Sequence, residues 1–309
     1  MDNNRNSEDS PFYNSTLIKT VVIENGVTSI GDYVFYGCTG LTSITIPDSV
    51  ISIGDDAFNR CTGLTGITIP DSVTCIGSMA FFCCSGLTSI IIPDSVTSIG
   101  AIAFLGCFAL ETMAVSEKNK YYDSRENCNA IINTKSNDLI YGCNSSVIPN
   151  SIKRIREYAF FGYRIEKIAI SNNVKSVENC AFYGCTSLKS ATIENGLTNI
   201  GDFAFSRCIS LTSIIIPDSV IKIGNNIFQD CSGLTNIVIS DNLTNISDNA
   251  FNGCTGLTNI NIPGRVTSIG TSAFLGCTNL KSIKIPNRVT EIGSESFKNC
   301  TGLTDILIG

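Results

Sequence analysis

The sequence predicts a β-rich solenoid of about twelve coils, each of about 23 residues. The first observation is a near-repeat, because residues 41–63 read LTSITIPDSVISIGDDAFNRCTG and residues 64–86 read LTGITIPDSVTCIGSMAFFCCSG. The second is a row of phenylalanines that recurs with the same period over most of its length: Phe35, Phe58, Phe81, Phe104, Phe160, Phe182, Phe205, Phe228, Phe251, Phe274 and Phe297. A fixed period of this length is the signature of stacked structural repeats, in which each unit completes the core of the next.

The start of each coil predicts a short strand. Leu41, Ile44 and Ile46 alternate with Ser43 and Thr45, which is the pattern of a strand with one buried face. The same pattern predicts strands near residues 18–23, 41–46, 64–69, 87–92, 188–193, 211–216, 234–239, 257–262, 280–285 and 303–308.

The remainder of each coil predicts two further elements. Pro47-Asp48-Ser49 predicts a turn, since proline presets φ and the two polar side chains bind nearby backbone N–H groups. Val50 and Ile53 form a second short apolar pair that ends at Gly54. We expect residues 56–58 to form a helical turn that places Phe58 in the interior.

One segment, residues 117–146, departs from the repeat. Ile131 and Ile132 mirror Leu139 and Ile140 about a polar turn, which predicts a β-hairpin. The hairpin fits either a recognition loop or a spacer coil packed on the stack, and we favour the spacer coil. The predicted organisation is a polar tail at residues 1–16 and a single solenoid at residues 17–309, with the insert at 117–146.

Ten of the fifteen cysteines follow a repeat phenylalanine by three residues. In-register positions of neighbouring coils are about 4.8 Å apart with parallel Cβ directions, whereas a disulfide requires Cβ atoms about 3.8 Å apart. The chain has no CxxC pair and no histidine, so zinc is not expected. We therefore predict a structural ladder of buried free thiols: Cys38, Cys61, Cys84, Cys107, Cys185, Cys208, Cys231, Cys254, Cys277 and Cys300.

Two of the other five cysteines, Cys128 and Cys143, are equidistant from the centre of the proposed hairpin. They are either free or bonded to each other, and the sequence leaves both states open. Cys75 and Cys180 occupy positions that hold Ser52 and Asp56 in another coil, so we expect them to be exposed.

The composition argues against several functions. A net charge of −6 without a basic stripe argues against nucleic-acid binding, and no apolar run approaches the length of a membrane span. The absence of histidine removes the commonest general base, and Asp48, Asp71, Asp94 and Asp218 lie in turns, where we interpret them as caps. Phosphate-binding glycine motifs are absent as well. We expect no enzymatic activity, no cofactor and no metal.

The pattern LxxIxIPxxVxxIGxxAFxxC resembles the BspA-like, treponemal-type family of leucine-rich-repeat proteins. The match covers residues 17–117 and 148–309, which is most of the chain. The resemblance implies a curved, right-handed leucine-rich-repeat superhelix. It also implies a microbial cell-surface or extracellular protein that binds host matrix proteins or proteins of neighbouring cells. The N-terminus, however, lacks the pattern of a signal peptide, so a cytoplasmic scaffold for protein–protein interactions is the alternative.

Stacked strands form the extended binding face of solenoid proteins. One of its outward positions holds Val22, Thr45, Thr68, Ile91, Ala114, Ala169, Thr192, Ile215, Val238, Asn261, Lys284 and Leu307 in successive coils, a series too irregular for an ice- or crystal-binding array. Early coils carry small outward residues such as Ser43 and Thr45, whereas later coils carry a polar patch: Asn236, Asn259, Asn261, Ser282, Lys284 and Asp305. The patch is explained either by sequence drift at solvated positions or by selection of a protein partner with an extended or acidic segment, and the second is the hypothesis that we test. The last coil, with Leu303, Ile306 and Ile308, further predicts either a truncated chain or end-to-end self-association through this coil.

Overall fold

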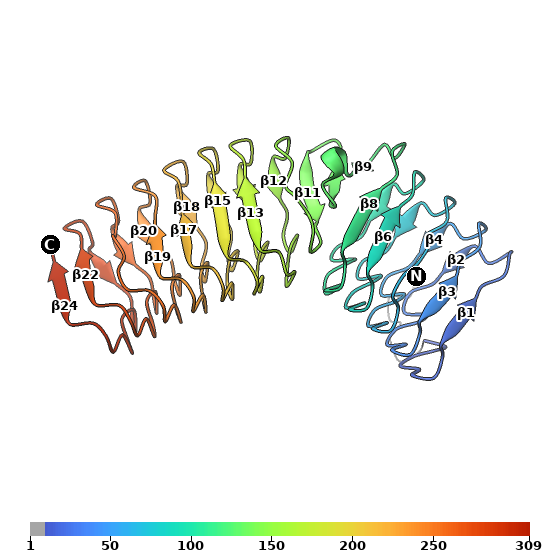
Figure 1. Cartoon of the computed structure of the whole chain (residues 1–309), viewed down its shortest axis with the longest axis horizontal. Helices are drawn as coiled ribbons and strands as arrows, with labels where there is room; N and C mark the ends of the chain where they lie inside the picture. Colours follow the sequence, from blue (N-terminus) through green and yellow to red (C-terminus); the bar gives the residue numbers. More distant parts are fainter. Residues whose placement is uncertain (1–9) are drawn as a thin grey trace. The chain divides into compact units, whose positions relative to one another are not determined.

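The computed structural model describes residues 10–309, so residues 1–9 of the predicted polar tail lie outside the described residues (Figure 1). The chain forms a β-solenoid of about 13 stacked coils of roughly 23 residues with almost no helix, which confirms the predicted fold class. It divides into two compact units. Among the described residues, the N-terminal unit comprises residues 10–136 and 141–146, and the C-terminal unit comprises residues 137–140 and 147–309.

In the N-terminal unit, most coils contribute strands to two sides of the stack. The longer strands are β1 (Thr20–Val22), β3 (Ser43–Thr45), β6 (Ser89–Ile92) and β8 (Thr112–Val115), which pair in parallel as β1–β3 and β6–β8. The second side holds two-residue strands in the order β2 (Ser29–Ile30), β4 (Ser52–Ile53), β5 (Cys75–Ile76) and β7 (Ser98–Ile99). We call these the strand side and the second side.

The C-terminal unit repeats this arrangement. Its strand side comprises β13 (Lys167–Ile170), β15 (Ser190–Ile193), β17 (Ser213–Ile215), β19 (Asn236–Val238), β22 (Ser282–Ile285) and β24 (Asp305–Ile308). Its second side comprises β12 (Arg154–Ile155), β14 (Ser176–Val177), β16 (Asn199–Ile200), β18 (Lys222–Ile223), β20 (Asn245–Ile246), β21 (Ser268–Ile269) and β23 (Glu291–Ile292). The pairs are parallel and each residue faces its equivalent in the next coil, as the repeat requires.

The insert contains the two strands of the predicted hairpin, β10 (Ile131–Asn133) and β11 (Asp138–Tyr141), with a tight turn between them. A further strand, β9 (Tyr122–Asp123), pairs antiparallel with β10. A short 3-10 turn, η2 (Arg125–Asn127), lies between β9 and β10. In the N-terminal unit the Tyr141 hydroxyl donates to the Gly100 carbonyl and accepts from the Ala103 N–H. These bonds hold part of the insert against the preceding coil, as a spacer coil requires.

The interior of each unit is organised around stacked phenylalanines. Phe58 stacks on Phe35 and on Phe81 with ring centroids 5.3 Å apart, and Phe205 stacks on Phe182 and Phe228 at 5.2 Å and 5.8 Å. Residues 10–16 of the predicted tail extend this order, because Phe12 stacks on Phe35 at 5.5 Å. The repeat period therefore places the same ring in the same place in each coil.

The predicted helical turn at residues 56–58 is wrong. Asp56 and Arg60 have positive φ values of 57° and 60°, and the N–H groups of Asp56, Phe58 and Arg60 donate to carbonyls of the next coil. A helix would direct those N–H groups back into its own turn. We call this part of each coil the turn arc. Its backbone bonds to the neighbouring coil, which explains why two residues four positions apart, such as Asp56 and Arg60, adopt the left-handed conformation.

Two predicted strands are reduced to isolated bridges. Residues 64–69 retain only the bridge from Gly66 to Ser89, and residues 257–262 retain only the bridge from Asn261 to Lys284. Glycine inside a strand weakens it, since it has no side chain to pack. Asparagine also has low strand preference, and the Asn259 side chain donates to Thr258 Oγ1.

The glycine that ends the second apolar pair is required by coil stacking. A Cβ added to Gly224 would lie 2.3 Å from the Asp202 nitrogen, and one added to Gly201 would lie 2.6 Å from the Asn179 nitrogen. Each coil approaches its neighbour too closely here for any side chain. The approach lets the Asp202 Oδ1 accept from the Asn225 N–H at 2.8 Å.

Candidate functional site

The strand side of the C-terminal unit presents two outward rows of residues. Inward residues such as Ile237 and Ile283 are buried, and the residues on either side of them are exposed. The first outward row is Lys167, Ser190, Ser213, Asn236, Asn259, Ser282 and Asp305. The second outward row is Ala169, Thr192, Ile215, Val238, Asn261, Lys284 and Leu307. Because the strands are in register, neighbours in a row are about 4.8 Å apart.

The structure places all six residues of the predicted polar patch on this face, and all six are exposed. Four lie in the first outward row, where Ser282 faces Asp305, and two lie in the second, where Asn261 faces Lys284. The structure thus brings the patch together on one surface. Its role in binding stays a prediction.

The patch combines hydrogen-bonding groups with an available positive charge. Thr304 Oγ1 donates to one oxygen of the Asp305 carboxylate, Oδ2, at 2.8 Å. Within residues 10–309, Lys284 forms no ion pair with a carboxylate. The ammonium group is therefore free to meet a negative charge from outside the chain.

Sequence reasoning did not single out two apolar residues beside the patch. Ile215 and Val238 are 61% and 51% exposed and face each other directly in the pairing of β17 with β19. The signal was present in the sequence, since two adjacent aliphatic residues replace the threonine found in other coils. Together with the patch they give one face both apolar and polar groups.

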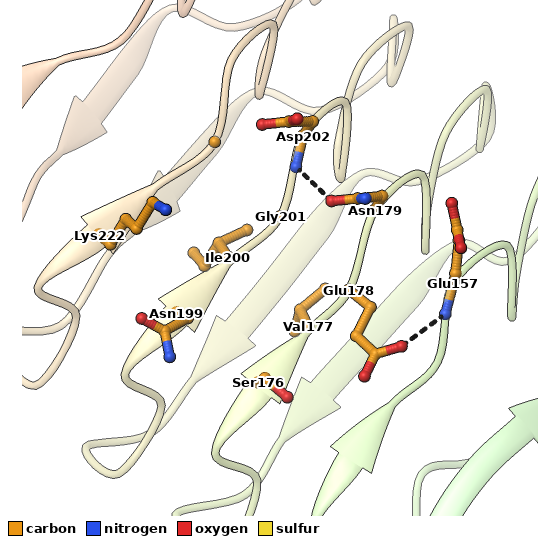
Figure 2. Close-up of a pocket in the computed structure, with 11 residues that line it drawn as sticks. Glu157, Ser176, Val177, Glu178, Asn179, Asn199, Ile200, Gly201, Asp202 and Lys222 are labelled. Carbon is orange, nitrogen blue, oxygen red and sulfur yellow. Dashed lines mark hydrogen bonds between the residues drawn. The ribbon is translucent and has the colours of Figure 1, made fainter.

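A second surface lies on the second side of the same unit, where a groove of about 500 Å³ crosses strands β14, β16 and β18 (Figure 2). Gly201 and Gly224 line it and contribute no side chain. Ser176, Asn199 and Lys222 line it from the strands, and further lining groups come from Glu157, Asn179 and Asp202. The groove follows directly from the glycines that coil stacking requires.

The polar groups of this groove are largely occupied by the chain itself. Asn179 Oδ1 accepts from the Asp202 N–H at 2.9 Å, and Glu178 Oε2 accepts from the Glu157 N–H at 3.3 Å (Figure 2). Arg156 forms an ion pair with Glu178, with 3.4 Å between Nε and Oε2. Asn179 and Glu178 thus cap backbone N–H groups of adjacent coils.

The ladder cysteines act as hydrogen-bond donors. Cys61 Sγ donates to the Phe35 carbonyl at 3.1 Å, and Cys231 Sγ donates to the Phe205 carbonyl at 3.0 Å. Burial raises the pKa of each of these two thiols to about 12, so both remain protonated near neutral pH. All fifteen cysteines are free in the structure. The thiol row therefore joins each coil to the one before it.

The cysteines outside the ladder differ in exposure. Cys128 and Cys143 are buried and unbonded to each other, and Cys143 Sγ donates to the Asn129 carbonyl at 3.3 Å. Cys75 and Cys180, which we expected to be exposed, are half-buried. Burial, together with Glu157 and Asp202, raises the pKa of Cys180 to about 11.

Two other kinds of site were sought within residues 10–309. No group of three or more Cys, Asp or Glu side chains there is arranged to hold a metal ion. Over the same residues, no helix has the length and apolar character needed to cross a membrane.

Helix-poor coils, a repeated interior and a variable outward face define a solenoid repeat protein. The model of the BspA type leucine rich repeat region, with six copies, matches residues 6–132, 129–235 and 198–309. The chain therefore belongs to the BspA-type leucine-rich-repeat family.

Solved structures from several bacteria are similar to this chain. A leucine rich cell surface protein from Faecalibacterium prausnitzii A2-165 is 32% identical, with a TM-score of 0.66 over 94% of this chain and 88% of that one. A leucine-rich repeat protein from Bacteroides ovatus is 27% identical, with a TM-score of 0.55 over 94% and 78% of the two chains. The pneumococcal vaccine antigen PcpA is 20% identical, with a TM-score of 0.67 over 94% and 79%, and shows the fold alone. The comparison with curated proteins gives no match.

Proposed function

We propose that this protein is a non-enzymatic, protein-binding scaffold of a microbial cell surface that mediates adhesion to host matrix or neighbouring-cell proteins. The observation that carries the proposal is the contrast between the uniform interior and the exposed, variable strand side of the C-terminal unit. The surface location rests on the family and on the similarity to the Faecalibacterium cell surface protein.

The polar patch is the part of that face that we propose contacts the partner. Its amides offer donors and acceptors, and Lys284 offers a charge that steers an acidic segment towards the face. We expect weak affinity for a single contact, since aromatic anchors are absent from both outward rows.

The binding test compares two triple variants of the full chain on a panel of extracellular-matrix proteins. Asn259→Ser, Asn261→Thr and Lys284→Thr together restore the residues of early coils, so folding is retained. The matched control, Asn199→Ser, Asn245→Ser and Lys222→Thr, changes the same residue types on the second side. We expect the first variant to lose capture and the control to keep it. Equal capture by parent and first variant would remove the patch as the site.

The location test uses intact cells of the source organism. We expect a membrane-impermeant biotin reagent to label lysines of the protein, together with known surface proteins and without cytoplasmic markers. Labelling only after lysis would favour the alternative of an intracellular protein–protein interaction scaffold.

A further inference from the structure

The apolar pair Ile215–Val238 differs from other exposed aliphatic residues of the C-terminal unit. Ile221 lies in the same coil and is 59% exposed, close to the 61% of Ile215. Ile221, however, stands on the second side between Thr198 and Thr244 in the neighbouring coils. Ile215 and Val238 instead face each other across two paired strands and so form one continuous apolar spot. Exposure alone does not distinguish the two positions, but this adjacency does.

The second outward row changes character within two coils of this spot. Val238 is followed in the row by Asn261 and then by Lys284, and these two residues face each other in register. Lys284 is the one cation of the row, and the Asp305 carboxylate in the neighbouring row accepts from Thr304. An apolar spot, an amide and an unpaired ammonium group therefore follow one another along one line.

We propose that this line binds an extended segment of a partner protein that carries an apolar residue followed or preceded closely by an acidic residue. The apolar side chain covers Ile215 and Val238, the carboxylate pairs with Lys284, and Asn261 bonds the backbone between them. The inference rests on the proposed protein-binding function and names the chemistry of the partner. Ile215 and Val238 supply the apolar anchor that the polar patch lacks, because binding energy concentrates on groups from which water is excluded.

The register sets the spacing of the two partner residues. Val238 and Lys284 are two strand steps apart, about 10 Å. An extended chain advances about 3.3 Å per residue, so the partner residues are about three positions apart. The flexible lysine side chain widens this to about two to four positions. A spacing of eight positions, about 26 Å in an extended chain, exceeds that reach.

The probe is a set of flexible Gly/Ser peptides displayed in several copies on streptavidin, so that avidity makes weak binding measurable. One carries Leu and Glu three positions apart. The three control peptides replace Leu by Ser, replace Glu by Lys, or place Leu and Glu eight positions apart. Binding of the full chain is measured by biolayer interferometry at low and high salt.

The protein variants have matched controls. Ile215→Thr with Val238→Thr keeps β-branched residues on the strands and introduces the residue found in other coils, and Ile221→Thr is its control. Lys284→Glu is paired with Lys222→Glu on the second side. Urea unfolding of each variant verifies that it folds like the parent.

We expect the Leu/Glu peptide with a spacing of three to bind best. The threonine pair lowers its binding about tenfold, given the apolar area withdrawn from contact, while Ile221→Thr leaves it unchanged. Lys284→Glu lowers binding of the Leu/Glu peptide about threefold, which is the size expected for an exposed ion pair. The peptide in which Lys replaces Glu then becomes the better ligand. High salt removes the preference for Glu over Lys.

Three results would overturn the inference: no peptide binds the parent, Ile221→Thr loses as much as the threonine pair, or Lys284→Glu leaves the preference for Glu intact. The proposed function fails separately. If the patch variant keeps full capture of matrix protein, the face is not the binding site. If that variant loses capture while the peptides show no preference, the face binds a partner of different chemistry.

Discussion

The inward and outward residues of each coil obey different rules. Inward, the turn arc carries the same phenylalanine and cysteine in most coils, with rings stacked at 5.1 Å for Phe160 on Phe182 and 5.8 Å for Phe205 on Phe228. Outward, the strand side varies from Ala169 to Lys284 within one row. The difference teaches that stacking tolerates almost no change at the interior and almost any change at the face. Mutations of inward and of outward residues should therefore differ widely in their effect on the free energy of unfolding.

The largest expected effect is alkaline unfolding. For seven fully buried ladder thiols, burial raises the pKa above the ordinary value of 9.0: Cys61, Cys84, Cys107, Cys185, Cys208, Cys231 and Cys254. Above pH 9 the unfolded chain loses these protons while the folded chain retains them. The free energy of unfolding therefore falls as pH rises from about 9 towards 12, by up to about 1.4 kcal/mol per thiol and pH unit.

At pH 10 the combined loss is of order 10 kcal/mol, enough to unfold most proteins. Urea midpoints measured under reducing conditions at pH 7, 8, 9 and 10 follow this loss. Replacing Cys208 and Cys231 by Ala should reduce the number of protons released on unfolding by about two. The free energy of unfolding should then fall less steeply between pH 9 and pH 10. A stability that is flat between pH 8 and pH 10 would contradict the buried-thiol ladder.

Removal of a stacked ring is expected to have the next largest effect. Phe205 is fully buried between Phe182 and Phe228, so Phe205→Ala should cost about 3–5 kcal/mol of unfolding free energy. Phe108 is 37% exposed, and Phe108→Ala serves as the control with a much smaller loss. Urea denaturation followed by circular dichroism measures both. Similar losses at the two positions would refute the special role of the ring row.

A methyl group at the coil junction tests the close approach of the coils. Gly224→Ala places its Cβ 2.3 Å from the Asp202 nitrogen and 2.4 Å from the Gly201 carbonyl carbon, and neither backbone atom can move freely. We expect a loss of about 1–3 kcal/mol. Gly264→Ala is the matched control, since its Cβ would meet nothing within 4 Å and it should be neutral or slightly stabilising. Thermal midpoints that fall equally in both variants would disprove the junction argument.

A single ladder thiol should matter less. Cys231→Ala removes the Sγ–H bond to the Phe205 carbonyl and leaves a small cavity, so we expect a loss of about 1–2 kcal/mol. Cys231→Val fills the volume without a donor and separates the two causes. If the valine variant is as stable as the parent, the hydrogen bond contributes little and volume alone explains the cysteine.

The smallest effect on stability is expected on the outward face. The triple change Asn259→Ser, Asn261→Thr and Lys284→Thr alters only exposed side chains, so unfolding should shift by no more than about 0.5 kcal/mol. Urea midpoints of the triple variant and the parent check this. A loss above about 2 kcal/mol would mean that the face supports the fold, and its use as a freely variable surface would then be in question.

The interior was predictable from the sequence because its chemistry repeats. The spacing from Phe58 to Phe81 gave the coil length, and the alternation around Ile44 gave the strand. The turn arc was not predictable, because the positive φ of Asp56 serves bonds to another coil rather than local preference. Short polar segments with an apolar residue every third position fit a helical turn equally well when the partner coil is unknown.

The candidate site was predictable only in position. The periodicity places Asn236 and Lys284 outward, but burial and register are needed to show that Ile215 and Val238 adjoin each other. In the sequence they stand one full repeat apart and look like ordinary strand residues. A face assembled from many coils is a property of stacking, which a local pattern does not contain.

The turn arc gives the stack a direction. The N–H groups of Tyr33, Phe35 and Gly37 all donate to the following coil, and the equivalent groups at residues 56, 58 and 60 do the same. Within the turn arc, each of these coils thus donates to the following coil and accepts from the preceding one, and the same bonds recur at most junctions of the described residues. A gene that gains or loses one regular repeat unit in frame keeps these turn-arc bonds and changes only the number of coils. Duplication can therefore lengthen and vary the exposed surface without any redesign of the interior.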